Sequence, residues 1–138
     1  MSAKAYSMDT NVIVRFLTKD DVILHGKAEE IMRAITQGRV RIACDPVILA
    51  EVVWVLSSYY RLPKADISKA LLAIVKPDNI LIPNKSRYIR ALEIFGKGQA
   101  HFGDACACAA AIEDCEGRLF SFDRELSKVA GIHRSENI

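Results

Sequence analysis

The sequence lacks any segment that could cross a membrane, because its longest apolar runs are interrupted by Glu51 or by basic residues. Its N-terminus lacks the basic stretch and long apolar core of a secretory signal. Neither sign of charge dominates, since 19 basic and 17 acidic residues give a net charge of +2. This balance excludes an argument for a nucleic-acid partner from bulk charge, so such a partner must be inferred from local groups.

The four cysteines lack the spacing of a zinc site. No Cys-x-x-Cys pair occurs, and Cys106 and Cys108 would point in different directions on a predicted helix. The three histidines do not complete a metal-binding pattern either. We interpret the cysteines as small core residues in a reducing cytosol and therefore expect a cytoplasmic protein.

The length and composition of the chain are typical of one globular domain. The 138 residues, of which 51% are hydrophobic and 26% charged, suffice for a hydrophobic core. No linker, repeat or low-complexity tract divides them. We therefore predict a single domain over residues 1–138.

Short apolar strands alternate with amphipathic helices along the chain. We predict strands near residues 4–8, 39–44, 80–82 and 119–122, with a weak strand or a tail from 132. Helices are expected near 12–17, 22–37, 47–60, 65–75, 86–95 and 124–129, with another that begins near Asp104 and ends at Glu116-Gly117. This alternation indicates an α/β fold, with right-handed crossovers and a parallel sheet covered on both faces.

Four acidic residues stand in apolar surroundings, where charged side chains are rare unless they are paired, hydrogen-bonded or bound to a metal. Asp9 and Asp123 each follow a predicted strand, so both lie at the carboxyl edge of the sheet, where ligands bind in such folds. Glu51 shares a helix face with Val47 and Trp54, which we interpret as a face that is not solvated. The fourth acid, Asp104, is expected at the first turn of a helix, so a shared cleft is geometrically reasonable.

Two of these acids also have a purely structural interpretation. Glu51 could extend from the edge of the apolar stripe or pair with a buried arginine. Asp104 is in line with Ala107, Cys108 and Ala111 on the packed side of its helix, and it could simply cap the helix and oppose the helix dipole. Taken alone, neither residue establishes a site.

Taken together, four carboxylates in one pocket would repel one another and raise each other's pKa values, and a divalent cation resolves this. Oxygen ligands without His or Cys favour Mg²⁺ or Mn²⁺. One or two such ions activate water and stabilise the attacking and leaving oxygens during phosphodiester cleavage. The pattern predicts a nuclease more readily than a sugar hydrolase, which needs two carboxylates flanking a glycosidic bond.

The segments around the four acids are similar to the acidic motifs of the PIN-domain ribonucleases. They follow the family's order and spacing over essentially the whole chain: Met8-Asp9-Thr10-Asn11-Val12, Leu49-Ala50-Glu51-Val52-Val53-Trp54-Val55-Leu56, Phe102-Gly103-Asp104-Ala105 and Ser121-Phe122-Asp123-Arg124-Glu125-Leu126. Within this family the chain resembles in particular the VapC toxins of toxin–antitoxin pairs.

The resemblance implies a PIN-like (Rossmann-like) three-layer fold, with a short central parallel sheet of four to five strands flanked by helices. It implies a Mg²⁺- or Mn²⁺-dependent endoribonuclease that cleaves RNA phosphodiester bonds. It also implies a small antitoxin protein whose C-terminal segment covers the active-site groove, and frequent homodimers. Carried over by position, the catalytic and metal-binding acids are Asp9, Glu51, Asp104 and Asp123, of which Asp9 and Asp104 are the first choice as direct ligands. The supporting polar residues would be Thr10, Asn11 and Ser121.

Three further residues are candidates for contacting RNA or orienting the acids. Arg15, one helix turn beyond the first motif, and Arg124, beside Asp123, each fit either role. His101 stands where many VapC-like chains have an acid, three residues before Asp104. It is either a contact to a phosphate or to the surroundings of the metal, or an ordinary loop or capping histidine.

Other protein classes also place an aspartate after the first strand. A haloacid-dehalogenase-type phosphatase requires a second aspartate where Asn11 stands, and a receiver domain requires an acidic pair ahead of a central phospho-acceptor, whereas Asp20-Asp21 lie in a connector. The remaining alternative is a catalytically silent binding module of the same fold, acting by docking RNA or a protein. Four intact acids favour the nuclease.

Overall fold

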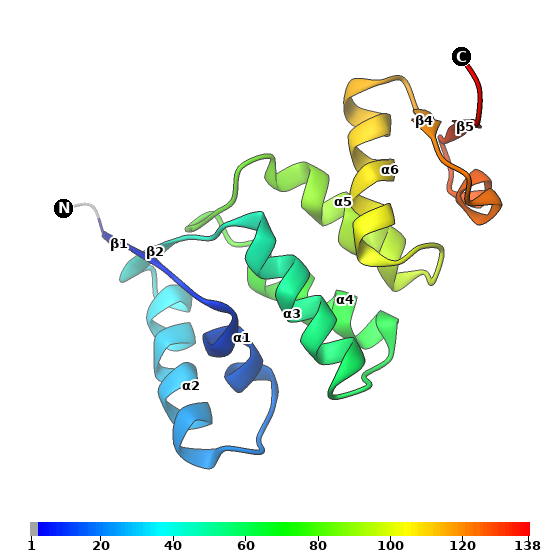
Figure 1. The fold of residues 1–138 in the computed structure, drawn as a ribbon. Helices are drawn as coiled ribbons and strands as arrows, with labels where there is room; N and C mark the ends of the chain where they lie inside the picture. Colours follow the sequence, from blue (N-terminus) through cyan, green and yellow to red (C-terminus); the bar gives the residue numbers. More distant parts are fainter. Residues whose placement is uncertain (1–2) are drawn as a thin grey trace. The chain divides into compact units, whose positions relative to one another are not determined.

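The computed structural model describes residues 3–138 and contains an α/β fold with short parallel strands (Figure 1). The predicted ranges agree closely with the observed bounds. In chain order the described elements are β1 (Lys4–Ser7), α1 (Thr10–Leu17), α2 (Val22–Thr36), β2 (Val40–Ala43), α3 (Pro46–Ser58), α4 (Lys64–Val75), β3 (Ile80–Leu81), α5 (Lys85–Gly96), α6 (Phe102–Asp114), β4 (Arg118–Phe120), the 3₁₀ helix η1 (Arg124–Lys128) and β5 (His133–Ser135).

The strands pair in two separate parallel sheets. β1, β2 and β3 form one sheet in that order, with Tyr6 opposite Ile42 and Ile42 opposite Ile80. β4 and β5 form the other, with Leu119 opposite Arg134. The predicted α/β class with parallel strands and flanking helices is confirmed, but the strands are divided between two sheets and do not make one central sheet of four to five strands. Strands this short form few ladder hydrogen bonds, so the helices beside each sheet contribute much of its stability.

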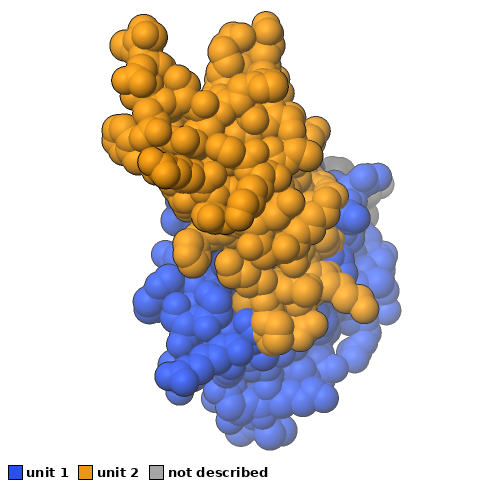
Figure 2. All heavy atoms as spheres, turned by 90° about the vertical axis from the view of Figure 1, so that its right-hand side faces the viewer, with its two compact units in different colours: residues 1–62, 73–83 blue, residues 63–72, 84–138 orange. Residues whose placement is uncertain are grey.

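The chain divides into two compact units, which are coloured separately in Figure 2. The first comprises residues 1–62 and 73–83 and contains α1, α2, α3 and the sheet β1–β2–β3. The second comprises residues 63–72 and 84–138 and contains α5, α6, η1 and the sheet β4–β5. The prediction of a single domain over residues 1–138 stays a prediction.

In the first unit, α1 packs against both α2 and α3. Three aspartates begin these helices: Asp9, Asp21 and Asp45 each cap a helix by accepting hydrogen bonds from backbone amides of its first turn. Asn79 secures the end of the sheet, because its Nδ2 donates to the carbonyl oxygens of Ile35 at 2.7 Å and Val40 at 3.0 Å. The buried core of the described part of this unit includes Ile13, Val14, Ala28, Met32, Ile35, Ile42, Leu49, Val52, Val53, Leu56 and Ile80.

In the second unit, α5 and α6 pack closely because the buried positions of α6 are mostly small. The rings of Phe95 and Phe102 meet edge to face with centroids 6.1 Å apart. Ser68 Oγ donates to the carbonyl oxygen of Leu92 at 2.7 Å, and this bond ties α4 to α5. The buried residues of α5 and α6 are Ala91, Leu92, Ile94, Phe95, Phe102, Ala105, Cys108, Ala109 and Ala111.

All four cysteines are free thiols. Cys44 and Cys108 are buried, as predicted, and Cys106 is half-buried, so that burial raises the pKa of its thiol to about 11. Cys115 is exposed, which corrects the prediction for that residue, because it lies at the end of α6 beyond the packed turns. In the part of the chain that the structure describes, no helix has the length and apolar character needed to cross a membrane.

Candidate metal centre

Asp9 and Glu51 come from the two helices that follow the neighbouring parallel strands β1 and β2. Because the strands are parallel, both helices begin at the same edge of the sheet. Asp9 Oδ1 caps α1 by accepting hydrogen bonds from the backbone N–H of Asn11 at 3.0 Å and of Val12 at 3.4 Å. Thr10 Oγ1 donates to Glu51 Oε2 at 2.7 Å across 41 positions of sequence. The first unit therefore brings Thr10, which follows Asp9 directly, into contact with Glu51.

The helix face that carries Glu51 is exposed, which corrects the prediction that it is not solvated. Val47 is 62% and Trp54 is 67% exposed, and Glu51 itself is exposed. α3 is apolar on most of its circumference and packs through Leu49, Val52, Val53 and Leu56, so the apolar pattern alone did not reveal which face is covered. The carboxylate of Glu51 is accordingly accessible to a solvated ion.

Asp104 lies in the first turn of α6, and Asp123 follows β4, a strand that packs against α6. Asp104 is half-buried in the first turn of α6, and its negative charge adds to burial in raising the pKa of the Cys108 thiol. Asp104 therefore lies on the side of α6 that carries the buried Cys108 and Ala111, whereas Ala107, which we predicted on the same packed side, is exposed.

The turn after β4 holds Asp123 by hydrogen bonds. The backbone N–H of Asp123 donates to Ser121 Oγ at 3.0 Å, and the supporting role of Ser121 stays a prediction. Asp123 Oδ1 accepts from the backbone N–H of Glu125 at 2.9 Å and caps η1. Arg134 Nη1 donates to the carbonyl oxygen of Ser121 at 2.7 Å. Sequence reasoning missed Arg134, because no local signal reveals that β5 pairs with β4.

The carboxylate oxygens of Asp9 and Glu51 suit a hard divalent cation. Asp9 and Glu51 each use one carboxylate oxygen for the hydrogen bonds described above, and the structure gives the other oxygen no hydrogen bond within residues 3–138. Oxygen-only ligands of this kind fit Mg²⁺ or Mn²⁺. Within the same residues, no three His, Cys, Asp or Glu side chains are arranged to hold one ion.

The remaining candidate residues are Asn11, His101, Arg124 and Arg15. Asn11 contributes its backbone N–H to Asp9, while its side chain is exposed. His101 is exposed at the N-cap position of α6 and makes no capping hydrogen bond with its side chain. Arg124 is exposed at the start of η1. Arg15 forms a salt bridge, but with Asp20 at 3.2 Å and with none of the four acids.

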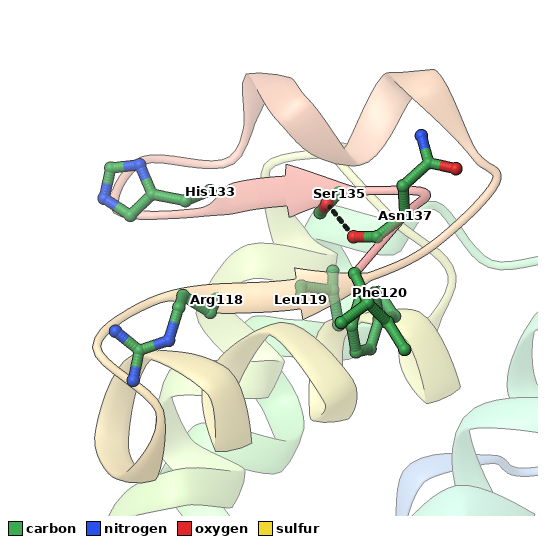
Figure 3. Close-up of a pocket in the computed structure, with 7 residues that line it drawn as sticks. Arg118, Leu119, Phe120, His133, Ser135 and Asn137 are labelled. Carbon is green, nitrogen blue, oxygen red and sulfur yellow. Dashed lines mark hydrogen bonds between the residues drawn. The ribbon is translucent and has the colours of Figure 1, made fainter.

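Hollows beside β4 and β5 do not include the acids. One of about 310 Å³ lies along both strands, where Arg118 and His133 mark one end and Phe120, Ser135 and Asn137 the other (Figure 3). Ser135 Oγ donates to the carbonyl oxygen of Asn137 at 2.8 Å, which closes the C-terminal side. The lining is mainly apolar, and we assign this hollow no role in metal binding.

Asp20 joins α1, the α1–α2 connector and the end of α3. Its Oδ2 accepts from Tyr60 Oη at 2.7 Å, and its Oδ1 accepts from Thr18 Oγ1 and Arg15 Nη1, each at 3.2 Å. The hydrogen bond from Tyr60, followed by that from Thr18 and the charge of Arg15, lowers the pKa of Asp20 below 3.8. The same hydrogen bond raises the pKa of Tyr60 above 10.0.

We expect this cluster to make stability fall at both ends of the pH range. The contribution of Asp20 is present above pH 3.8 and is lost as the pH falls through its lowered folded pKa, whereas that of Tyr60 is present below pH 10.0 and is lost as the pH rises through its raised folded pKa. Urea unfolding midpoints against pH measure both effects. Tyr60→Phe should remove the alkaline loss, and an unchanged alkaline profile in this variant would contradict the assignment.

Comparison with known protein families identifies a match over most of the chain. The PIN domain family matches residues 6–132, a range that includes all four acids. PIN domains are in general nucleases, and they typically use divalent metals. A search of curated proteins finds no relative of the chain. Because the match covers well over half of the sequence, the chain belongs to the PIN domain family.

Proposed function

We propose that this protein is a Mg²⁺- or Mn²⁺-dependent endoribonuclease that cleaves RNA phosphodiester bonds. The observation that carries the proposal is the hydrogen bond from Thr10 to Glu51, which places two exposed acids from distant motifs at one edge of the sheet. Exposed carboxylates held side by side repel each other unless a cation is present. Membership of a family of nucleases supports a phosphodiester as the substrate.

In this proposal Asp9, Glu51, Asp104 and Asp123 hold the metal, which supplies an activated water and stabilises charge on the phosphate. Thr10 fixes the carboxylate of Glu51, and Ser121 shapes the turn that carries Asp123. The cap formed by Asp9 on α1 leaves its second oxygen for the ion.

The finer part of the proposal concerns biological role. The spacing of the acidic motifs supports a VapC-like toxin of a toxin–antitoxin pair, acting in the cytoplasm on an RNA substrate. Its protein partners would be a small cognate antitoxin and a second copy of the chain in a homodimer. Copurification with the product of a neighbouring short reading frame, and the mass in solution, test these two partners.

Cleavage of a structured RNA mixture by the purified chain tests the activity. We expect cutting with Mn²⁺ or Mg²⁺ and none with EDTA, because the carboxylates bind the ion that activates water. Cutting that survives EDTA would contradict the metal mechanism. The absence of cutting under every condition would favour the silent binding module.

Metal binding can be measured without RNA, because Trp54 lies one turn beyond Glu51 on the same exposed face and is the one tryptophan of the sequence. We expect paramagnetic Mn²⁺ to quench its fluorescence with a saturating midpoint, and diamagnetic Mg²⁺ to compete. Glu51→Gln should raise that midpoint by about tenfold or more. The control is Glu29→Gln on α2, which should leave the Mn²⁺ midpoint unchanged. Quenching that rises linearly with Mn²⁺ and never saturates would count against a formed site.

A further inference from the structure

Arg134 connects β5 to both ends of the turn that carries Asp123. Its side chain is only 15% exposed. Nη1 donates to the carbonyl oxygen of Ser121 at 2.7 Å, and Nε donates to Ser127 Oγ at 3.0 Å. Glu136 lies 3.1 Å from Nη1 and balances the charge. One guanidinium therefore joins the residue before the turn to the helix after it.

Asp123 lies between these two anchor points and has little else to hold it. The residue is exposed, so packing does not fix its position. Its local hydrogen bonds, with Ser121 Oγ and the backbone N–H of Glu125, are both internal to the turn. The direction of the carboxylate consequently depends on whatever fixes the turn as a whole.

The geometry of a guanidinium suits this task better than a simple positive charge. Its N–H donors form a rigid planar fork, so two acceptors are held at a fixed separation. A lysine ammonium would reach one acceptor at a time on a flexible chain. Arg124 is adjacent to Asp123 in sequence, but it is exposed, and within residues 3–138 the structure gives it no salt bridge.

We infer that Arg134 is the positioning residue of Asp123: it holds the turn between Ser121 and Ser127 so that the carboxylate meets the metal. The inference rests on the proposed metal-dependent nuclease and adds a residue to it. Arg134 itself touches neither the ion nor the RNA in this scheme. Its effect should therefore appear in metal affinity more than in the rate at saturating metal.

Arg134→Met tests this assignment. We expect the Mn²⁺ midpoint for RNA cleavage to rise about 10–100-fold, as is typical when a residue that orients a metal ligand is lost, while the rate at saturating Mn²⁺ falls much less. Arg134→Lys should recover part of the shift because it keeps one donor. Ser127→Ala removes one acceptor and leaves the bond to Ser121, so it should give a smaller shift without threatening the fold.

The matched control is Arg118→Met. Arg118 begins β4, the neighbouring strand, at the end away from Phe120 (Figure 3), and its salt bridge with Glu116 at 3.2 Å is exposed. Exposed pairs contribute little, so we expect the wild-type midpoint. An equal shift in Arg118→Met would show that general charge is responsible and would overturn the inference.

A second readout needs neither metal nor activity. The backbone N–H of Glu125 donates to Asp123 Oδ1, so its hydrogen exchange reports on the turn. We expect this amide to exchange about tenfold faster in metal-free Arg134→Met, and no faster in Arg118→Met, in the range expected for opening of a local hydrogen bond. Unchanged exchange together with an unchanged Mn²⁺ midpoint would overturn the role of Arg134 while wild-type cleavage still supported the nuclease. Wild-type protein that never cleaves RNA would instead overturn the proposed function.

Discussion

Asp9→Asn is expected to lower RNA cleavage in Mn²⁺ by at least about 100-fold. Losing a residue that only orients a metal ligand costs about 10–100-fold, and Asp9 is proposed as a direct ligand. Asparagine keeps a side-chain oxygen that can accept from the amides of Asn11 and Val12, so the cap of α1 should persist. Initial rates on one RNA, measured beside the unfolding midpoint of each protein, separate lost chemistry from lost stability.

Asp45→Asn is the matched control for Asp9→Asn. Asp45 also follows a strand and caps a helix, and it accepts from the backbone N–H of Val47 at 2.8 Å, but it is not one of the four acids. Its replacement should leave cleavage within about twofold of wild type, as expected for a cap that asparagine also forms. Asp104→Asn should match Asp9→Asn. Full activity in both site variants would refute the metal site and favour the silent binding module.

Gly117→Ala is expected to destabilise the protein by about 3 kcal/mol or more, because a strained backbone alone costs about 1–3 kcal/mol. Gly117 has a φ of +81°, and an added Cβ would stand 1.9 Å from the carbonyl oxygen of Gly131. The same segment pairs the strands, since the N–H of His133 donates to the carbonyl oxygen of Gly117 at 2.8 Å. Urea unfolding at neutral pH measures the loss.

The control for this variant is Gly26→Ala. Gly26 lies inside α2, and an added Cβ there would meet nothing within 4 Å. Alanine should stabilise the helix by up to about 1 kcal/mol, because glycine is a poor helix former. If Gly117→Ala unfolded within about 1 kcal/mol of wild type, the crowding between the residues that precede β4 and β5 would contribute little to stability.

Local rules allow most of the fold, and part of the candidate site, to be predicted from the sequence. Helix starts are short-range, and Asp9 and Asp45 are found capping helices immediately after strands. Because the carboxyl ends of parallel strands meet at a common edge, the sequence predicts Asp9 at that edge, with Glu51 on a flanking helix. Ser121 is a candidate only through the family resemblance of the motif around Asp123, and its hydrogen bond with Asp123 spans two positions.

Long-range pairing was decided by the tertiary structure. An apolar helix face does not say what covers it, so the exposure of Trp54 beside Glu51 emerged only from the packing of α3. A charged side chain can pair with any suitable partner within reach. Arg15 forms a salt bridge with Asp20, and Arg134 donates a hydrogen bond to the turn that carries Asp123. The sequence by itself determined which elements form and which acids end them. Only the tertiary structure decided which strands pair and which partners the arginine side chains take. Such contacts join residues that no local pattern relates.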